Sequence, residues 1–112
     1  MQRSLLYLAP VVTFMCVAIL TLPSPLRAQS DGAKLFSTNC TLCHAADGSG
    51  TSPTGKALKA KDLRSAEVQK VSDADITALI TNGKGKMPAF GKKLKPDDVK
   101  ALVVYIRSLA TK

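Results

Sequence analysis

The chain has 112 residues, 46% of them hydrophobic, and a formal net charge of +8. Aromatic residues make up only 4% and Trp is absent, so a single domain of this size buries a modest core with its own side chains. The basic balance would suit a nucleic-acid partner, but no aromatic residues interleave with the lysines, so we expect no nucleic acid to bind.

The first 28 residues have the layout of a secretory signal peptide. Arg3 supplies a positive start, the 18 residues 5–22 are almost wholly apolar, and Ala28 is a small residue suited to cleavage. Cleavage after Ser30 fits the small-x-small rule better, so the signal ends between 28 and 30. We therefore expect an exported, periplasmic protein. The alternative is an uncleaved membrane anchor, because 18 apolar residues lie at the lower edge of what spans a bilayer.

The rest of the chain, 31–110, is expected to form one all-α domain with three main helices and a short one. The first helix covers about 31–39, where apolar residues recur at helical spacing. The second begins after Ser72, with Asp75 three positions on completing a capping-box-like pair. Gly83 is its stop signal.

The third main helix begins at Pro96, a residue that suits the first helical position, and Asp97 and Asp98 suit its positive N-terminus. A shorter helical piece is expected around 65–70. Nothing in the sequence calls for a sheet. The apolar stripe of the third helix consists of Val99, Leu102, Val103, Ile106 and Leu109.

Residues 40–44, Cys-Thr-Leu-Cys-His, carry the strongest functional signal. The thiols of Cys40 and Cys43 have the spacing that adds across the two vinyl groups of a haem, and His44 then falls under the iron as its proximal ligand. Cys16 lies in the apolar segment of the signal peptide and is removed with it, and His44 is the only His of the chain. All Cys and His residues of the mature chain therefore lie within residues 40–44. We therefore predict one covalently attached haem c.

Two other interpretations of this pentapeptide are weaker. A thioredoxin-like redox pair would need strands alternating with helices around it, and no convincing parallel-strand run of Val and Ile appears. A structural zinc site would need a fourth protein ligand, which the sequence does not offer.

Met87 is the predicted sixth ligand of the iron. It is the only Met left once the signal is removed, and it lies in an irregular stretch rich in Gly with Pro88 beside it. A Met that merely fills a gap in a core belongs between helices instead. A thioether is a soft, neutral ligand, and Met/His pairing is an electron-transfer arrangement.

The chain resembles the class I cytochromes c, and the resemblance covers Gly32 to Leu109. Residues 32–36, Gly-Ala-Lys-Leu-Phe, are similar to the family's N-terminal helix, and Tyr105 has the position of its aromatic partner on the C-terminal helix. Residues 82–90, Asn-Gly-Lys-Gly-Lys-Met-Pro-Ala-Phe, are similar to the axial-Met loop of small carriers, including photosynthetic ones. The resemblance implies a small cytochrome c fold around a single haem.

The resemblance also implies that the carbonyl of Pro53 accepts a hydrogen bond from the free ring nitrogen of His44, which would orient the ring. One position departs from the photosynthetic carriers, which usually have Gln where this chain has Leu79. Residues 51–71 are more similar to monohaem domains of heterotrophic bacteria, so a respiratory carrier is the more specific expectation.

The charge of the mature chain bears on its partners. Without Arg3 and Arg27 it has 14 Lys and Arg against 8 Asp and Glu, a net charge of about +6. Lysines around an exposed haem edge would steer the protein to an acidic redox partner. The alternative is that these lysines form an ordinary solvated surface with no docking role. These lysines flank the Met loop and are Lys84, Lys86, Lys92, Lys93 and Lys95; candidates for pairing with the haem propionates are Lys59, Lys61 and Arg64.

The sequence thus predicts a monomeric, periplasmic one-electron carrier that works by outer-sphere transfer in a respiratory chain. No catalytic residue is required, since the protein only sets the potential, burial and docking face of its cofactor, so we expect no enzyme. The alternatives are an open-site haem protein, such as a peroxidase or a gas-binding protein, and a haem subunit of a larger oxidoreductase complex.

Overall fold

The structure is a computed structural model that describes residues 24–111. The apolar run at 5–22 and Cys16, on which the signal-peptide prediction depends, lie outside the described residues. Among the helices that the structure describes, none is both long enough and apolar enough to cross a membrane.

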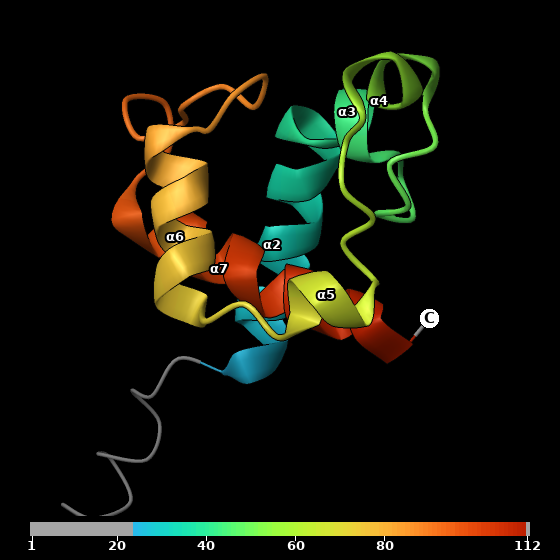
Figure 1. Ribbon diagram of the computed structural model, residues 1–112. Coiled ribbons are helices and arrows are strands. Elements are labelled where there is room, and N and C mark those ends of the chain that lie inside the picture. Colours follow the sequence, from blue (N-terminus) through green and yellow to red (C-terminus); the bar gives the residue numbers. More distant parts are fainter. Residues whose placement is uncertain (1–23, 112) are drawn as a thin grey trace, which may run out of the picture.

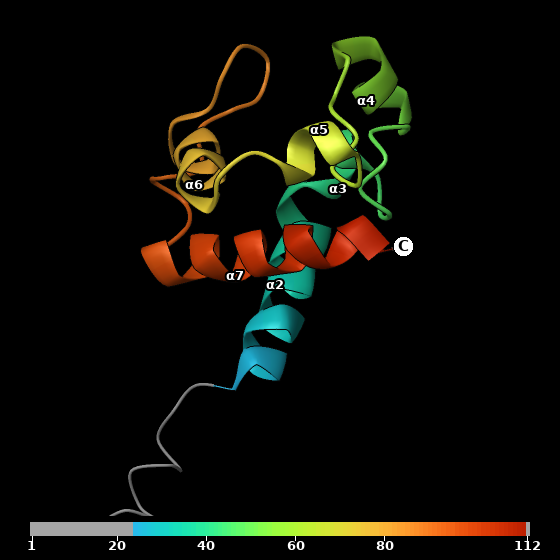
Figure 2. The same ribbon diagram turned by 60° about the horizontal axis from the view of Figure 1, so that its bottom comes forward.

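The described chain is all-α, as predicted (Figures 1 and 2). Over residues 24–111 the only extended pairing is an isolated antiparallel bridge between Lys84 and Met87. The helices are α2 (Pro25–Asn39), α3 (Thr41–His44), α4 (Pro53–Leu58), α5 (Ala66–Gln69), α6 (Asp73–Asn82), α7 (Pro96–Ser108) and the 3-10 turn η1 (Leu109–Thr111).

The predicted helix starts are confirmed where a capping residue marks them. The hydroxyl of Ser72 accepts a hydrogen bond from the N–H of Asp75 at 3.1 Å, and Gly83 ends α6 with φ +71°. Pro96 begins α7, as expected. The first helix differs, because α2 begins at Pro25, a residue suited to the first helical turn, rather than near 31.

The short helices α3 and α4 were not predicted. Each spans six residues or fewer, too short for an apolar period to show in the sequence. Helix α4 begins at Pro53, within a stretch that contains Gly48, Gly50 and Gly55. The expected piece around 65–70 is α5.

The architecture depends on a close crossing of α2 and α7 (Figures 1 and 2). A Cβ added to Gly32 would overlap the carbonyl of Ala101 and lie 2.8 Å from the Cβ of Tyr105. One turn further along α2, the ring of Phe36 lies 5.1 Å from that of Tyr105, in a tilted pair at 50°. This is the aromatic contact that the resemblance implied.

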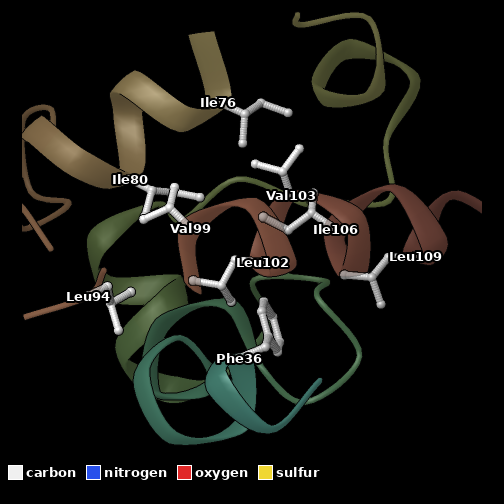
Figure 3. Packing of buried hydrophobic residues seen from close by; sticks show 9 residues of the cluster. All are labelled: Phe36, Ile76, Ile80, Leu94, Val99, Leu102, Val103, Ile106 and Leu109. Atoms are coloured by element: carbon white, nitrogen blue, oxygen red, sulfur yellow. The ribbon is translucent and has the colours of Figure 1, made fainter. Parts of the chain in front are cut away.

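The hydrophobic core lies between α2, α6 and α7. Leu102 is fully buried, with Phe36 and Leu109 at 1% exposure. Ile76 and Ile80 of α6 face α7, so α6 packs on the side of α7 away from α2 (Figure 3). The apolar stripe predicted for the third helix is buried in full, since its members are 0–5% exposed.

Replacing Gly32 by Val should lower the free energy of unfolding of the haem-loaded protein by about 1–3 kcal/mol, the usual effect of overpacking a tight contact. The added side chain has to push α2 away from the carbonyl of Ala101. Urea unfolding followed by circular dichroism measures the loss. Lys34→Ala, on an exposed position of the same helix, is the control; a Gly32→Val protein as stable as this control would contradict the packing described.

Candidate functional site

The two segments predicted to bear ligands lie at the same end of the molecule. One is the C-terminal end of α2 with α3, and the other is the loop 83–91 that follows α6 (Figure 1). Both rise on the same side of α7 (Figure 2). Segments far apart in the sequence thus lie at the same end of the molecule, because α2 and α6 each pack on α7 and point the same way.

Cys40 and Cys43 lie within one tight turn at the α2–α3 junction. The N–H of Cys40 donates to the carbonyl of Phe36 at 2.9 Å, which ends α2. The N–H of Cys43 donates to the carbonyl of Cys40 at 3.2 Å, and that of His44 donates to the same carbonyl at 2.9 Å. Both cysteines are free thiols, so neither is occupied by a disulfide.

The environment of Cys40 favours the neutral thiol. Burial raises its pKa to about 11, the nearby thiol of Cys43 adds to the increase, and the positive charge of Lys93 partly opposes it. At neutral pH Cys40 is therefore protonated. Lys93, which comes after the Met loop in the sequence, is therefore close enough to the cysteine turn for its charge to influence the Cys40 thiol.

His44 is the last residue of α3, and the structure corrects the expected partner of its ring. Nδ1 lies 3.1 Å from the carbonyl oxygen of Lys61, not from that of Pro53, which instead begins α4. The chain leaves the helix through Ala45, a non-glycine residue with φ +61°, and the N–H of Gly50 donates to the His44 carbonyl at 2.8 Å. The contact with Lys61 leaves the other ring nitrogen for a ligand.

Ser52 holds α3 and α4 together, a role that the sequence analysis missed. Its Oγ lies 2.7 Å from the carbonyl of Leu42 and 3.1 Å from that of Cys43, and it accepts a hydrogen bond from the N–H of Gly55 at 2.9 Å. The pair Ser52-Pro53 is itself a helix-start signature and could have revealed α4. Gly55 packs directly on the Cys43 carbonyl, where no Cβ fits.

Loop 83–91 is a closed turn tied back to α6. Lys84 and Met87 exchange two backbone hydrogen bonds of 3.0 Å, and Gly85 turns the chain with φ +57°. The N–H groups of Phe90 and Gly91 donate to carbonyls in the last turn of α6, at 2.9 and 3.0 Å. These bonds satisfy carbonyls that a helix end leaves open, and they fix the loop relative to α6.

Met87 is held in this turn with its side chain only partly buried against the core. A Cβ at Gly83 would lie 2.7 Å from the Met87 carbonyl oxygen. The φ of +71° at Gly83 is also a backbone angle that glycine adopts without strain and other residues rarely adopt. Phe90, from the same loop, and Cys40, from the cysteine turn, are partly buried against the same core. The rim of the core at this end is thus made of incompletely covered apolar and sulfur-bearing side chains.

Two of the residues proposed for propionate pairing already hold carboxylates of the chain. Arg64 Nε lies 3.0 Å from Asp62 and its Nη1 lies 3.4 Å from Asp47, while Lys61 Nζ lies 3.0 Å from Glu67. The hydrogen bond from Arg64 lowers the pKa of Asp62, and hydrogen bonds from Ser49 lower that of Asp47. The segment before α5 thus carries several paired charges close to Lys61, whose carbonyl oxygen the His44 ring contacts.

The lysines that flank the loop are all exposed, and among residues 24–111 none of them has an ion-pair partner. Their charges are therefore available to a partner protein at the end of the molecule that carries the cysteine turn. We call this group the lysine cluster: Lys84, Lys86, Lys92, Lys93 and Lys95.

The donor set fits a covalently attached haem. Two free thiols three residues apart match its two vinyl groups, an imidazole follows at once, and a thioether lies in the facing loop. The partly covered rim at Cys40, Met87 and Phe90 offers apolar surface that a macrocycle would bury. A structural zinc site does not fit, because the described residues contain no cluster of three or more His, Cys, Asp or Glu that could hold a metal.

Comparison with known proteins gives consistent matches. Residues 27–106 match the family model described as cytochrome C oxidase, cbb3-type, subunit III. A cytochrome c6 of Porphyra purpurea is 37% identical over 112 residues, covering 100% of this chain and 98% of the relative. The cbb3-type cytochrome c oxidase subunit FixP of Azorhizobium caulinodans is 38% identical over 89 residues, which cover 78% of this chain but 29% of FixP.

A solved structure agrees with these matches. The KustC0563 c-type cytochrome superposes with a TM-score of 0.65 at 40% sequence identity, covering 70% of this chain and 95% of that one. The similarity therefore extends from sequence to fold.

Replacing Ser52 by Ala should lower the free energy of unfolding by about 1–2 kcal/mol, since it removes a helix cap and leaves carbonyls at the cysteine turn without their donor. Chemical denaturation of the haem-loaded protein measures the change. Ser37→Ala, at an exposed position in α2, should stay within about 0.5 kcal/mol of the wild type. Equal stability of the two variants would argue against the bridging role of Ser52.

Proposed function

Because the chain belongs to the small class I c-type cytochromes, we propose that it is a one-electron carrier with a single haem c. Cys40 and Cys43 would hold the haem through thioether bonds, and His44 and Met87 would ligate its iron. The observation that supports this most directly is that both donor segments lie at the same end of the fold (Figure 1). No catalytic residue takes part, and the protein is not an enzyme.

The residues of the chain each do a separate part of the work. The haem iron, when bound, supplies the exchange between ferric and ferrous states. Lys61 holds the His44 ring by its carbonyl at 3.1 Å, which keeps one ring nitrogen engaged and the other free to ligate. The closed loop would hold Met87 in the same place in either oxidation state, so little would have to reorganise when an electron passes.

Ligation by Met87 is favoured over a gap-filling role by its setting. Its backbone is fixed by the reciprocal bonds with Lys84, while its side chain is left partly uncovered at the core rim. A Met that only filled a cavity would be buried between helices. An open-site haem protein, such as a peroxidase or a gas-binding protein, would leave this thioether without a function.

We further propose that the protein is exported and periplasmic, is monomeric, and serves a respiratory chain. Export is supported by the signal-like segment 1–28 and by the cysteine pair, which in this class receives haem outside the cytoplasm. The partners would be acidic redox proteins, because the lysine cluster leaves unpaired positive charge beside the loop of Met87.

The second candidate is a haem subunit of a larger oxidoreductase complex. The matches to a cbb3-type subunit III model and to FixP favour it, although the matched segment covers only 29% of FixP. Its haem site would use the same four residues. The two candidates differ in whether the purified chain is active alone as a diffusing carrier.

Replacing Met87 by Ala in the ferric, haem-loaded protein should abolish the weak near-infrared sulfur-to-iron band and convert low-spin haem to high-spin. The reason is that the thioether sulfur is the proposed sixth ligand. Optical spectroscopy measures both changes. Leu42→Ala is the control: Leu42 lies inside the pentapeptide but is 71% exposed, so this variant should keep the band.

A wild-type protein with high-spin haem and no such band would exclude Met87 as ligand. It would then favour the open-site candidate.

Removing two charges of the lysine cluster with Lys86→Gln and Lys92→Gln should slow electron transfer to an acidic redox protein about 10-fold at low salt, since steering depends on the local field. The dependence on ionic strength should also become flatter. Stopped-flow kinetics measures both. Lys34→Gln with Lys100→Gln removes the same charge elsewhere and is the control; equal slowing by both pairs would mean that only net charge matters.

A further inference from the structure

One side chain of the C-terminal helix reaches across to the start of α6. Arg107 Nε lies 2.9 Å and its Nη2 2.7 Å from Asp73 Oδ1, at the first residue of α6. The same guanidinium donates to two backbone carbonyls, that of Gln69 at 2.9 Å and that of Val71 at 2.5 Å. We call this set of bonds the Arg107 bridge.

The Arg107 bridge is better placed than an ordinary surface ion pair. The Arg107 side chain is 29% exposed and that of Asp73 is 71% exposed, while both partners of the surface pair between Lys100 and Asp97, also on α7, are 77% and 94% exposed. Gln69 reinforces the bridge, because its Nε2 donates to the carbonyls of Leu63 and Ile106 at 2.7 and 3.0 Å. The planar guanidinium of Arg107 has several N–H donors in a fixed geometry, so a lysine ammonium at this position would not make the same set of hydrogen bonds.

The bridge holds one end of the helix whose other end carries Met87. Helix α6 has ten residues, about 15 Å of rigid rod. Its apolar contact with α7 comes mainly from two buried residues, Ile76 and Ile80 (Figure 3). Rocking of α6 about this small contact would displace the loop at its far end, and the Arg107 bridge opposes such rocking at the near end.

We propose that Arg107 is a positioning residue for Met87, keeping the thioether in place through α6. This inference rests on the proposed function, because it assumes that Met87 ligates the iron. Loss of the bridge does not change Met87 or its loop in sequence. It lowers the free energy needed for Met87 to move away from the iron. A foreign ligand then takes the vacated position more readily.

Imidazole titration of the ferric, haem-loaded protein tests this. Imidazole displaces Met87 in proportion to how easily the loop moves away, and loss of the near-infrared band reports the displacement. For Arg107→Gln we expect the apparent Kd of imidazole to fall about 10-fold, equivalent to about 1.4 kcal/mol. Asp73→Asn removes only the carboxylate and should give a smaller fall, so it also tests the inference if Arg107→Gln does not fold.

Lys100→Gln is the matched control, because it removes one positive charge and one exposed ion pair from the same helix. Its apparent Kd should equal that of the wild type. The inference is overturned if Arg107→Gln and Asp73→Asn bind imidazole as the wild type does, even if both unfold at lower denaturant. Absence of the band from the wild type would instead refute the proposed function, so the two failures are distinguishable.

Discussion

The crossing of α2 and α7 is the contact on which the rest of the structure depends. At Gly32 the two backbones approach so closely that a Cβ would overlap the Ala101 carbonyl, and the ring pair of Phe36 and Tyr105 lies one turn further on. This crossing sets the direction in which the C-terminal end of α2 points. Because Cys40 is the residue that ends α2, the position of the whole cysteine turn follows from the crossing.

The Met87 side of the site is positioned indirectly, through α6 and its contacts with α7. Helix α6 packs on α7 through two isoleucines and is tied to it at its first residue by Arg107. At its other end, carbonyls of the last turn accept the hydrogen bonds that fix the Met loop. Met87 therefore depends on α7 just as the cysteine turn does, and α7 is the common reference for both sets of ligands.

Polar groups complete the site where the apolar core stops. Ser52 joins α3 to α4, the carbonyl of Lys61 holds the ring of His44, and Arg64 gathers two carboxylates beside them. On the opposite arm the lysine cluster is left without ion-pair partners within the described chain. Beside His44, Arg64 and Lys61 are thus paired with carboxylates of the chain, while the lysine cluster presents its positive charge outward, an arrangement suited to brief docking of an acidic protein.

The sequence by itself determined the groups whose meaning is local. Cys40, Cys43 and His44 are recognisable from their spacing, α6 and α7 from Ser72 and Pro96, and the core face of α7 from its period. Each of these signals lies within a short stretch of the chain. Only the tertiary structure decided which carbonyl the His44 ring meets, that Ser52 bridges two helices, and that Arg107 reaches Asp73. These contacts join residues 9 to 34 positions apart. Their formation depends on how α2 and α6 pack on α7, which no short-range pattern encodes.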